Sequence, residues 1–241
     1  KKINMSKTSG NASNIEGVSG EKNIVKLWKE HYSKILNCSN DTTEESYVKD
    51  FIKRNSGSNF NPFHVSELGE AIDSLKSGKS PGMDKLQSEH FKYAGDGLYV
   101  YLTLLFNSIF IHGYIPSELM KSAIVPILKD KRGLVTEKDN YRPIAVTTVM
   151  SKILELIMLN RMQSQVKTTD NQFGFKSNHS TDRRVYTMRS IIEYYNRCDS
   201  PVYVCFLDAS KAFDRINHYK LFRKRINRNI DCTILRVIMY S

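Results

Sequence analysis

Two aspartates lie six residues apart in the segment FLDASKAFDRINH, residues 206–218. The first, Asp208, follows an unbroken apolar run, Pro201–Leu207, which predicts a strand covered on both faces because its residues do not alternate. A carboxylate at the end of such a strand stands at the rim of a sheet, where it could hold Mg²⁺. It could equally cap the turn that follows. Asp214 could likewise begin a helix, near the positive end of its dipole, and Phe213 could be a core residue.

A second group of charged residues lies between two apolar, strand-like runs. Lys129, Lys131 and Arg132 follow the first run, and Arg142 lies in the second, before a proline. Two cations on adjacent strands could grip a triphosphate, with Arg142 offering a fork of donors and Lys129 a point charge. A solvated turn would explain Lys131 and Arg132 equally well. It explains Arg142 poorly, because that residue has apolar neighbours.

A glycine between two phenylalanines marks a third candidate, the loop Asn171–Phe175. The glycine suggests close approach of the backbone to a ligand, and aromatic rings beside Lys176 and Arg183 suit a nucleic-acid strand. Alternatively, Phe173 and Phe175 pin the loop in the core, which is the role we expect for the two rings.

A fourth candidate is the glycine-proline loop Gly78–Asp84, which carries Lys79. Its backbone amides and Lys79 could meet a phosphate group, although many loops contain these residue types. By itself this loop decides nothing about function.

The four motifs follow one another as KSGKSPGMDKL, VPILKDK with NYRPIAV, NQFGFKSNHST and FLDASKAFD. In this order they closely resemble the reverse transcriptases of LINE-type (non-LTR) retrotransposons. The resemblance runs from about Leu75 to about Ile226, and FLDASKAFDRINH and NYRPI are its most specific parts. It implies an RNA-directed DNA polymerase that adds dNTPs to the 3′-hydroxyl of a DNA primer along template RNA, with two Mg²⁺ ions as cofactors.

The resemblance also implies roles for the residues of the last motif. Asp208 matches the catalytic, first metal-binding aspartate of the polymerase palm, with the backbone carbonyl of Ala209 nearby. Phe213 matches the aromatic residue that excludes a nucleotide 2′-hydroxyl, whereas Asp214 would only organise the turn. In a two-metal mechanism, the ions would activate the primer 3′-hydroxyl and stabilise the leaving pyrophosphate.

The other motifs match nucleotide-binding and template-binding parts of the family. Arg142, and less securely Lys129, match residues that hold the incoming triphosphate. Gln172 and Gly174 match a motif that lies against the template and the nucleotide site, and the loop 78–84 matches one associated with template RNA. Contacts with nucleic acid are therefore expected for five cations: Lys79, Lys131, Arg132, Lys176 and Arg183.

The charge of the chain fits a polyanionic partner. Its 241 residues include 36 Lys and Arg against 25 Asp and Glu, a net charge of +11. Residues 1–120 hold 14 of each sign, so the whole excess lies in residues 121–241. Because the basic residues are dispersed among folded-looking segments, they favour nucleic acid over a membrane, although a solvated basic surface is the alternative.

Composition also bears on where the protein acts. No apolar run reaches the roughly 20 residues of a membrane span, and no secretory signal is recognisable. The four cysteines have neither metal-site nor disulfide spacing. We therefore expect an intracellular protein of the cytoplasm and nucleus, neither secreted nor bound to a membrane. Its oligomeric state stays open.

The elements that position these residues are predicted from apolar periodicity and from glycine, proline and capping signals. Helices are expected at about residues 21–36, 45–52, 67–77 (capped by Ser66), 86–93, 98–112, 149–166, 181–198, 219–226 and 232–240, and strands at 122–128, 141–147 and 202–207.

The fold class is α+β, and the resemblance implies a right-hand polymerase fold with fingers and an incomplete palm. Such a fold would be mostly helical, with a basic β-hairpin and one buried palm strand. We expect a disordered linker at 1–20, a helical connector at 21–64, fingers and the template-binding region at 65–200, and a partial palm at 201–241.

One part of the family pattern is missing. The second metal motif, an aromatic residue followed by x-Asp-Asp, is absent, and the chain contains no Asp-Asp pair. We therefore expect an incomplete and inactive fragment of a polymerase, either natively truncated or excerpted from a longer chain. The alternative is a remnant of a degenerate or domesticated element that binds RNA or DNA without catalysis. An open palm would leave the strand 202–207 without a neighbour, as an exposed apolar edge.

Overall fold

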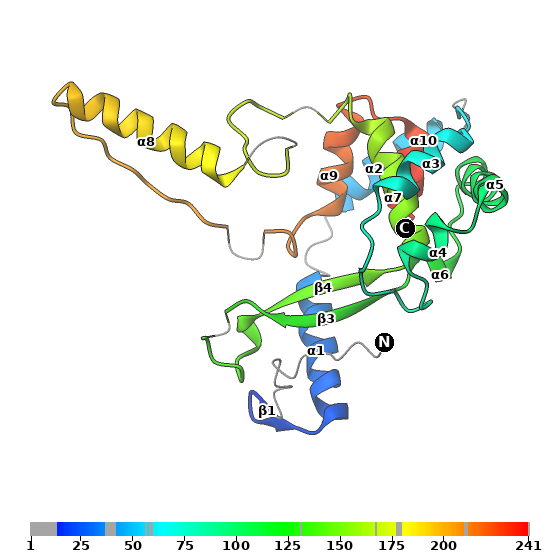
Figure 1. The fold of residues 1–241 in the computed structure, drawn as a ribbon, viewed down its shortest axis with the longest axis horizontal. Coiled ribbons are helices and arrows are strands. Elements are labelled where there is room, and N and C mark those ends of the chain that lie inside the picture. Colours follow the sequence, from blue (N-terminus) through cyan, green and yellow to red (C-terminus); the bar gives the residue numbers. More distant parts are fainter. Residues whose placement is uncertain are drawn as a thin grey trace.

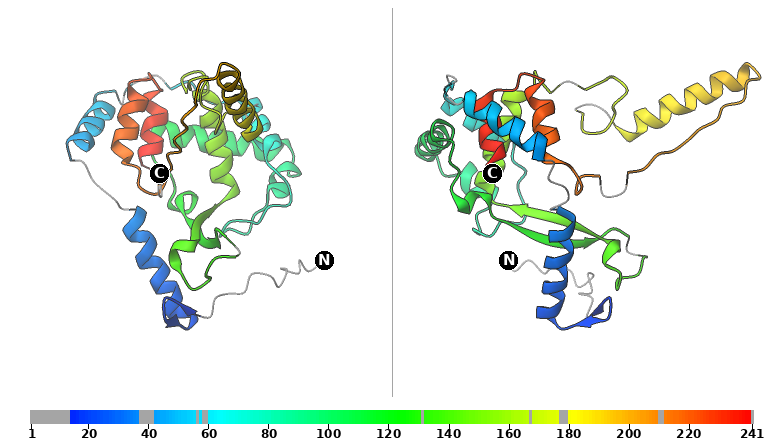
Figure 2. Two further views of the ribbon diagram at one scale, coloured as in Figure 1. Left: turned by 90° about the vertical axis from the view of Figure 1, so that its left-hand side faces the viewer. Right: turned by 180° about the vertical axis from the view of Figure 1, so that it is seen from behind.

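The computed structural model describes residues 14–36, 42–55, 57, 60–130, 132–166, 168–176, 180–209 and 212–240. It shows a helical body, a β-hairpin with one helix beside it, and a long helix that projects away from the body (Figure 1, Figure 2). Within the described residues the sheets are two separate two-stranded hairpins. The fold is therefore mostly helical with small sheets, which confirms the α+β class in its coarse form.

Helices from distant parts of the chain share the core of the body. They are α2 (Thr42–Arg54), α3 (Val65–Ser74), α4 (Ser88–Lys92), α5 (Asp96–His112), α6 (Ser117–Met120), α7 (Val149–Met162), α9 (His218–Ile226) and α10 (Cys232–Met239). Helix α3 packs against α5 and α7, and α10 packs against α5, α9 and α2. The side chains of Leu68, Phe106 and Ile153 are fully buried between them. This single core extends across the predicted boundary between residues 200 and 201.

None of the helices in the described part of the chain combines enough length with enough apolar character to span a bilayer. The longest helix of the body, α5, has 17 residues.

Side chains at their first residues set where two of these helices begin. At the start of α7, Thr148 Oγ1 accepts a hydrogen bond from the amide of Ser151 (3.2 Å) and satisfies one of the donors that a helix end leaves free. At the start of α3, the carboxylate of Glu67 accepts a hydrogen bond from the amide of His64 (2.8 Å). Ser66, the predicted cap, already lies inside α3, so that prediction is wrong.

The basic β-hairpin has the bounds predicted from the sequence. Its antiparallel strands are β3 (Ser122–Leu128) and β4 (Tyr141–Thr147), and a short 3-10 helix, η1 (Lys138–Asn140), precedes β4. In the register of the two strands, Ile127 lies opposite Arg142.

Two prolines lie directly opposite one another in this ladder, Pro126 in β3 and Pro143 in β4. The amide of Lys129 donates a hydrogen bond to the carbonyl of Asn140 (2.8 Å), and hydrogen-bonded pairs recur at every second position from there. The proline pair therefore falls at a position without cross-strand hydrogen bonds. That placement costs no ladder hydrogen bond, because proline has no N–H.

The N-terminal part of the described chain forms a unit of its own. It consists of β1 (Asn14–Ile15), β2 (Val18–Ser19) and α1 (Glu21–Leu36), the last with its predicted bounds. A second, smaller core contains Ile15, Trp28 and Tyr32. The prediction of a disordered linker is therefore wrong for residues 14–19, because Ile15 gives the segment an apolar anchor. Residues 1–13 lie outside the described residues.

The segment before Asp208 differs most from expectation. Helix α8 (Thr181–Arg197) has no buried residue, and residues 201–209 run back toward the body without forming a helix or strand (Figure 1). Tyr203, Phe206 and Leu207 are 92, 82 and 94% exposed. The prediction of a buried palm strand is therefore wrong. A strand needs a partner for its backbone N–H and C=O groups, and no described segment pairs with this one.

Candidate functional site

Arg142 and Lys129 lie on the same face of the β-hairpin. Arg142 is opposite Ile127, and residues i and i+2 of an extended chain share a face, so Lys129 lies diagonally across from Arg142. The neighbouring apolar residues on this face are open to solvent, with Val125, Ile127 and Ile144 exposed by 42, 50 and 42%. The two cations therefore stand together at the loop end of an accessible surface.

The two cations differ in what they contact. Lys129 Nζ donates a hydrogen bond to the backbone carbonyl of Asp139 (2.6 Å). The exposed guanidinium of Arg142 has no hydrogen-bond or ion-pair partner within the described part of the chain. A guanidinium with its donor fork free can bind a phosphate through two parallel hydrogen bonds. The arrangement can take a phosphate, with Arg142 as the first ligand and Lys129 as a second charge.

The loop between the strands is held by Asn140, a residue that the sequence reasoning missed. Its Nδ2 donates a hydrogen bond to the carbonyl of Asp130 (3.1 Å), and its Oδ1 accepts one from the amide of the same residue (3.3 Å). Gly133 packs so closely that a Cβ there would lie 2.6 Å from Asn140 Nδ2. Arg132 is exposed on this loop, and Lys131 lies outside the described residues. The first position of NYRPI was the available signal for Asn140.

The glycine-proline loop lies against the base of the same hairpin. Gly82 touches the junction of β4 and α7: a Cβ on it would lie 2.8 Å from the carbonyl oxygen of Thr147 and 2.9 Å from the Cα of Thr148. Only glycine allows two backbones to approach this closely. The fold thus brings two of the predicted motifs, 78–84 and the hairpin, into direct contact.

The other end of this loop is held by a carboxylate. The amide of Gly78 donates a hydrogen bond to Glu89 Oε1 (2.6 Å), and this bond holds the pKa of that carboxyl below its usual range. Gly78 has a φ of 71°, a left-handed conformation that favours glycine. Lys79 is exposed between the two attachments at Gly78 and Gly82.

Two phenylalanines from different motifs meet outside the core. The rings of Phe175 and Phe213 pack edge to face with centroids 5.4 Å apart, and they are 89 and 70% exposed. The expectation that Phe175 pins its loop in the core is therefore wrong. Gln172 Nε2 donates a hydrogen bond to the carbonyl of Gly174 (3.0 Å), so this motif also folds onto itself.

Two further cations border this motif. Lys176 Nζ lies 3.5 Å from the carboxylate of Asp170. Arg183 is exposed in the first turn of α8, where its amide donates a hydrogen bond to Ser180 Oγ (3.3 Å). The side chain of Arg183 is open to a polyanion, whereas that of Lys176 is only 25% exposed.

The predicted metal ligands do not form a metal site. Asp208 and Ala209 are exposed, and Asp208 has no hydrogen-bond or ion-pair partner among the described residues. The same residues include no cluster of three or more His, Cys, Asp or Glu that could hold a metal ion. Two Mg²⁺ ions about 4 Å apart need several carboxylate oxygens to offset their repulsion. One carboxylate and one carbonyl do not fit such a centre.

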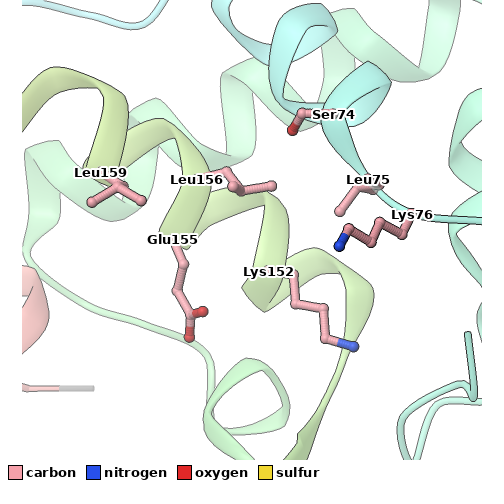
Figure 3. Close-up of a pocket in the computed structure, with 7 residues that line it drawn as sticks. All are labelled: Ser74, Leu75, Lys76, Lys152, Glu155, Leu156 and Leu159. Atoms are coloured by element: carbon pink, nitrogen blue, oxygen red, sulfur yellow. The ribbon is translucent and has the colours of Figure 1, made fainter. Parts of the chain in front are cut away.

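A pocket of about 290 Å³ lies between the end of α3 and the side of α7 (Figure 3). It is lined by Ser74, Leu75, Lys76, Lys152, Glu155, Leu156 and Leu159. None of the predicted site residues lines it, although Lys76 is the first residue of the motif KSGKSPGMDKL.

Comparison with known proteins identifies the chain's relatives. Residues 127–239 match the family described as reverse transcriptase (RNA-dependent DNA polymerase). The chain is 32% identical over 169 residues to the RNA-directed DNA polymerase from mobile element jockey of Drosophila funebris, which covers 68% of the chain and 18% of that protein. It is 33% identical over 175 residues to the probable RNA-directed DNA polymerase from transposon BS of Drosophila melanogaster, with the same two coverages.

A third relative is the probable RNA-directed DNA polymerase from transposon X-element of Drosophila melanogaster, 31% identical over 166 residues that cover 66% of the chain and 18% of that protein. The chain thus spans less than a fifth of the length of these curated relatives. The family match includes Lys129, Arg142 and the segment with Asp208 and Phe213. The resemblance seen in the motifs is confirmed: the chain belongs to the reverse transcriptase family, with relatives in LINE-type non-LTR retrotransposons.

Proposed function

We propose that this chain supplies the nucleotide-binding and template-binding part of a retrotransposon RNA-directed DNA polymerase. The observation that carries the proposal is the hairpin face on which Arg142 and Lys129 stand together, with the guanidinium of Arg142 exposed and unpartnered among the described residues. Arg142 binds two oxygens of the incoming dNTP triphosphate. Lys129 gives up its hydrogen bond to the carbonyl of Asp139 and binds a third oxygen of the triphosphate.

The proposal extends to the nucleic acid. Template RNA and the DNA primer bind through five cations: Lys79, Lys131, Arg132, Lys176 and Arg183. Gln172 and Gly174 face the template beside the nucleotide. The exposed ring of Phe213, which packs against the ring of Phe175, contacts the nucleotide sugar and disfavours a 2′-hydroxyl. The protein works in the cytoplasm and nucleus, where such templates occur.

Within this proposal the chain is part of a right-hand polymerase, with a connector at 21–64, fingers at 65–200 and part of the palm at 201–241. The exposed apolar run before Asp208 supports the division, because such a run gains a partner strand when a palm sheet is complete. The apolar residues of α8, which include Val185 and Tyr194 at 60 and 64% exposure, gain cover in the same way.

Reverse transcriptases generally use divalent metal ions, which would supply the charge needed at the 3′-hydroxyl and the leaving pyrophosphate. The ligands in the described residues do not fit that role, and the sequence holds no Asp-Asp pair. The contribution of this chain is therefore to bind and orient: Arg142 fixes the triphosphate, and Phe213 the sugar. By itself the 241-residue chain is inactive.

The binding part of the proposal is tested by equilibrium binding of labelled dTTP to the chain. Arg142→Ala is expected to weaken dTTP binding about 10- to 100-fold, because charge-assisted hydrogen bonds contribute about 1.5–3 kcal/mol. Arg142→Lys should recover part of the loss, since it keeps the charge but not the fork. Arg197→Ala, an exposed arginine at the end of α8, is the matched control and should bind as the wild type does. Equal dTTP affinity in Arg142→Ala and wild type would overturn the proposal.

The second candidate, a remnant that binds nucleic acid without a nucleotide site, is favoured by the excess of basic residues after residue 120. It predicts RNA binding that falls steeply with salt and no dTTP binding at all. Primer extension on poly(rA)/oligo(dT) should give no product with the 241-residue chain under either candidate. Extension that Asp208→Asn abolishes would show that the chain is a complete catalyst.

A further inference from the structure

The N-terminal helix α1 packs against Tyr141, the residue next to Arg142. Trp28 stacks on Tyr32 with ring centroids 5.3 Å apart and an interplanar angle of 14°, and it meets Tyr141 edge-on at 5.0 Å. Ile15 closes this small core, which is separate from the core of the body. We call Ile15, Trp28, Tyr32 and Tyr141 the aromatic clamp. Its members come from the N-terminal unit and from the first residue of β4.

The N-terminal unit also holds the loop of the hairpin. The amide of Glu16 donates a hydrogen bond to the carbonyl of Thr136 (2.9 Å), and its carboxylate pairs with Lys138 (2.7 Å). From the other side, Tyr141 Oη donates to the carbonyl of Val135 (2.7 Å). The segment between the strands is thus attached both to the N-terminal hairpin and to the clamp.

Because Tyr141 and Arg142 are consecutive in a strand, their side chains point to opposite faces of the hairpin. Packing Tyr141 against α1 therefore directs Arg142 to the open face. A shift of register by one residue would exchange the two and place the guanidinium against the apolar side of α1. The clamp is thus the feature that specifies which face presents the cation.

We propose that the aromatic clamp positions Arg142 for the incoming triphosphate, with Trp28 and Tyr141 as positioning residues that never touch the nucleotide. This inference rests on the proposed function, in which Arg142 binds the triphosphate. It makes the N-terminal unit, which lies outside residues 127–239 matched by the family, a part of the nucleotide site.

A second neighbour of the clamp fits this role. Burial and the charge of Asp214 raise the pKa of Tyr32 to about 12. The ring contact between Trp28 and Tyr141 places α1 next to the hairpin, and the charge of Asp214 acts on the same helix.

The test measures dTTP affinity in Trp28→Ala, Tyr141→Ala, their double variant and Tyr141→Phe. Each alanine variant is expected to weaken dTTP binding about fivefold, because an arginine that must be immobilised on binding loses the corresponding entropy. The double variant should lose no more than either single one, since both remove the same support. Tyr141→Phe keeps the ring and should bind within twofold of wild type.

Combining the clamp variants with Arg142→Ala shows whether they act through Arg142 or by destabilising the whole fold. In an Arg142→Ala background, Trp28→Ala and Tyr141→Ala should have no further effect on dTTP affinity, because the group they orient is gone. Phe63→Ala removes a buried ring from the core of the body and should lower the melting temperature without changing dTTP affinity. Tyr101→Ala, at a residue 74% exposed on α5, should change neither.

The outcomes test the role of the clamp separately from the proposed nucleotide-binding function. If Arg142→Ala weakens dTTP binding but the clamp variants do not, the inference is overturned and the proposed function stands. If Arg142→Ala has no effect, both fall. If the alanine variants fail to fold, the fluorescence emission of Trp28 tests the coupling between the clamp and Arg142 instead. Trp28 is the one tryptophan of the sequence, so the signal comes from the clamp itself. Saturating dTTP should shift this emission in the wild type and not in Arg142→Ala, and an unchanged spectrum in both would refute the coupling.

Discussion

Gly82→Ala tests whether the glycine-proline loop presses on the base of the hairpin. The new Cβ would lie 2.8 Å from the carbonyl oxygen of Thr147, 2.9 Å from the Cα of Thr148 and 3.0 Å from the carbonyl carbon of Thr147. Ordinary contacts of this kind begin at about 3.3–3.6 Å, so the two backbones must separate by roughly 0.5 Å or more. All three atoms belong to the backbone, so no side chain can rotate away.

The cost follows from what would have to move. Thr148 is buried and caps α7, where its Oγ1 bonds to the amide (3.2 Å) and the hydroxyl (2.8 Å) of Ser151. Moving the junction would strain a cap that contributes about 0.5–2 kcal/mol, and overpacking in general costs about 1–3 kcal/mol. Gly82 does not have a positive φ, so the alanine would cause no backbone strain and the loss of stability would come from the steric clash alone. We expect Gly82→Ala to lower the free energy of unfolding by about 1–3 kcal/mol.

Urea denaturation followed by far-ultraviolet circular dichroism measures this loss, and two other glycines calibrate it. Gly97→Ala, in the first turn of α5 with no atom within 4 Å of the new Cβ, should be neutral or stabilising by up to about 1 kcal/mol. Gly78→Ala has equally free space but a φ of 71°, so backbone strain alone should cost about 1 kcal/mol. If Gly82→Ala were as stable as Gly97→Ala, the close packing of the loop on the hairpin would be refuted.

Other perturbations address the body and the isolated aspartate. Arg161→Met should lower the free energy of unfolding by about 2–3 kcal/mol. The reason is that Nε and Nη2 each donate a 2.8 Å hydrogen bond to the carboxylate of Glu67, and Nη1 donates one to the carbonyl of Asn61. Urea denaturation measures the loss, and the control Arg161→Lys should show an intermediate loss of unfolding free energy. Hydrogen bonding to Arg161 holds the pKa of Glu67 below its usual range, so this pair stabilises the fold above about pH 4.3 and loses its effect as the pH falls through the lowered pKa. The stability difference between wild type and Arg161→Met should therefore shrink on acidification below pH 4, and a constant difference would contradict the linkage. Asp208→Asn should leave the free energy of unfolding in urea unchanged to within about 0.5 kcal/mol, because the carboxylate is exposed and unpartnered among the described residues. A large destabilisation would contradict this exposed position.

Elements whose signals are local could be predicted from the sequence with good bounds. The helix Glu21–Leu36 and the strands Ser122–Leu128 and Tyr141–Thr147 have the predicted bounds, because apolar spacing and flanking breakers lie within the segments themselves. The run before Asp208 has an equally strong local pattern, yet it forms no strand. A strand exists only with a partner, and the identity of a partner is not written in the run itself.

The candidate site also has parts that could be predicted from the sequence and parts that could not. The sequence predicts the two strands that carry Lys129 and Arg142, but the register that puts both cations on one face is seen only in the structure. The contacts of Gly82 with Thr147 and of Trp28 with Tyr141 join segments more than 60 residues apart, and no periodicity announces them. Such supports of a site are visible only once the chain is folded.

The opposed prolines of the hairpin have a consequence for how the protein behaves in concentrated solution. At a pair without cross-strand hydrogen bonds, the N–H and C=O groups point outward, to the two open edges of the ladder. Pro126 and Pro143 therefore remove a donor from the middle of both edges at once, so a strand from another molecule would lose a hydrogen bond on either side. The hairpin is protected against growing into an intermolecular sheet, while the run 203–207 has no proline to protect it. Self-association should begin there, and a single lysine in that run should raise the solubility of the chain.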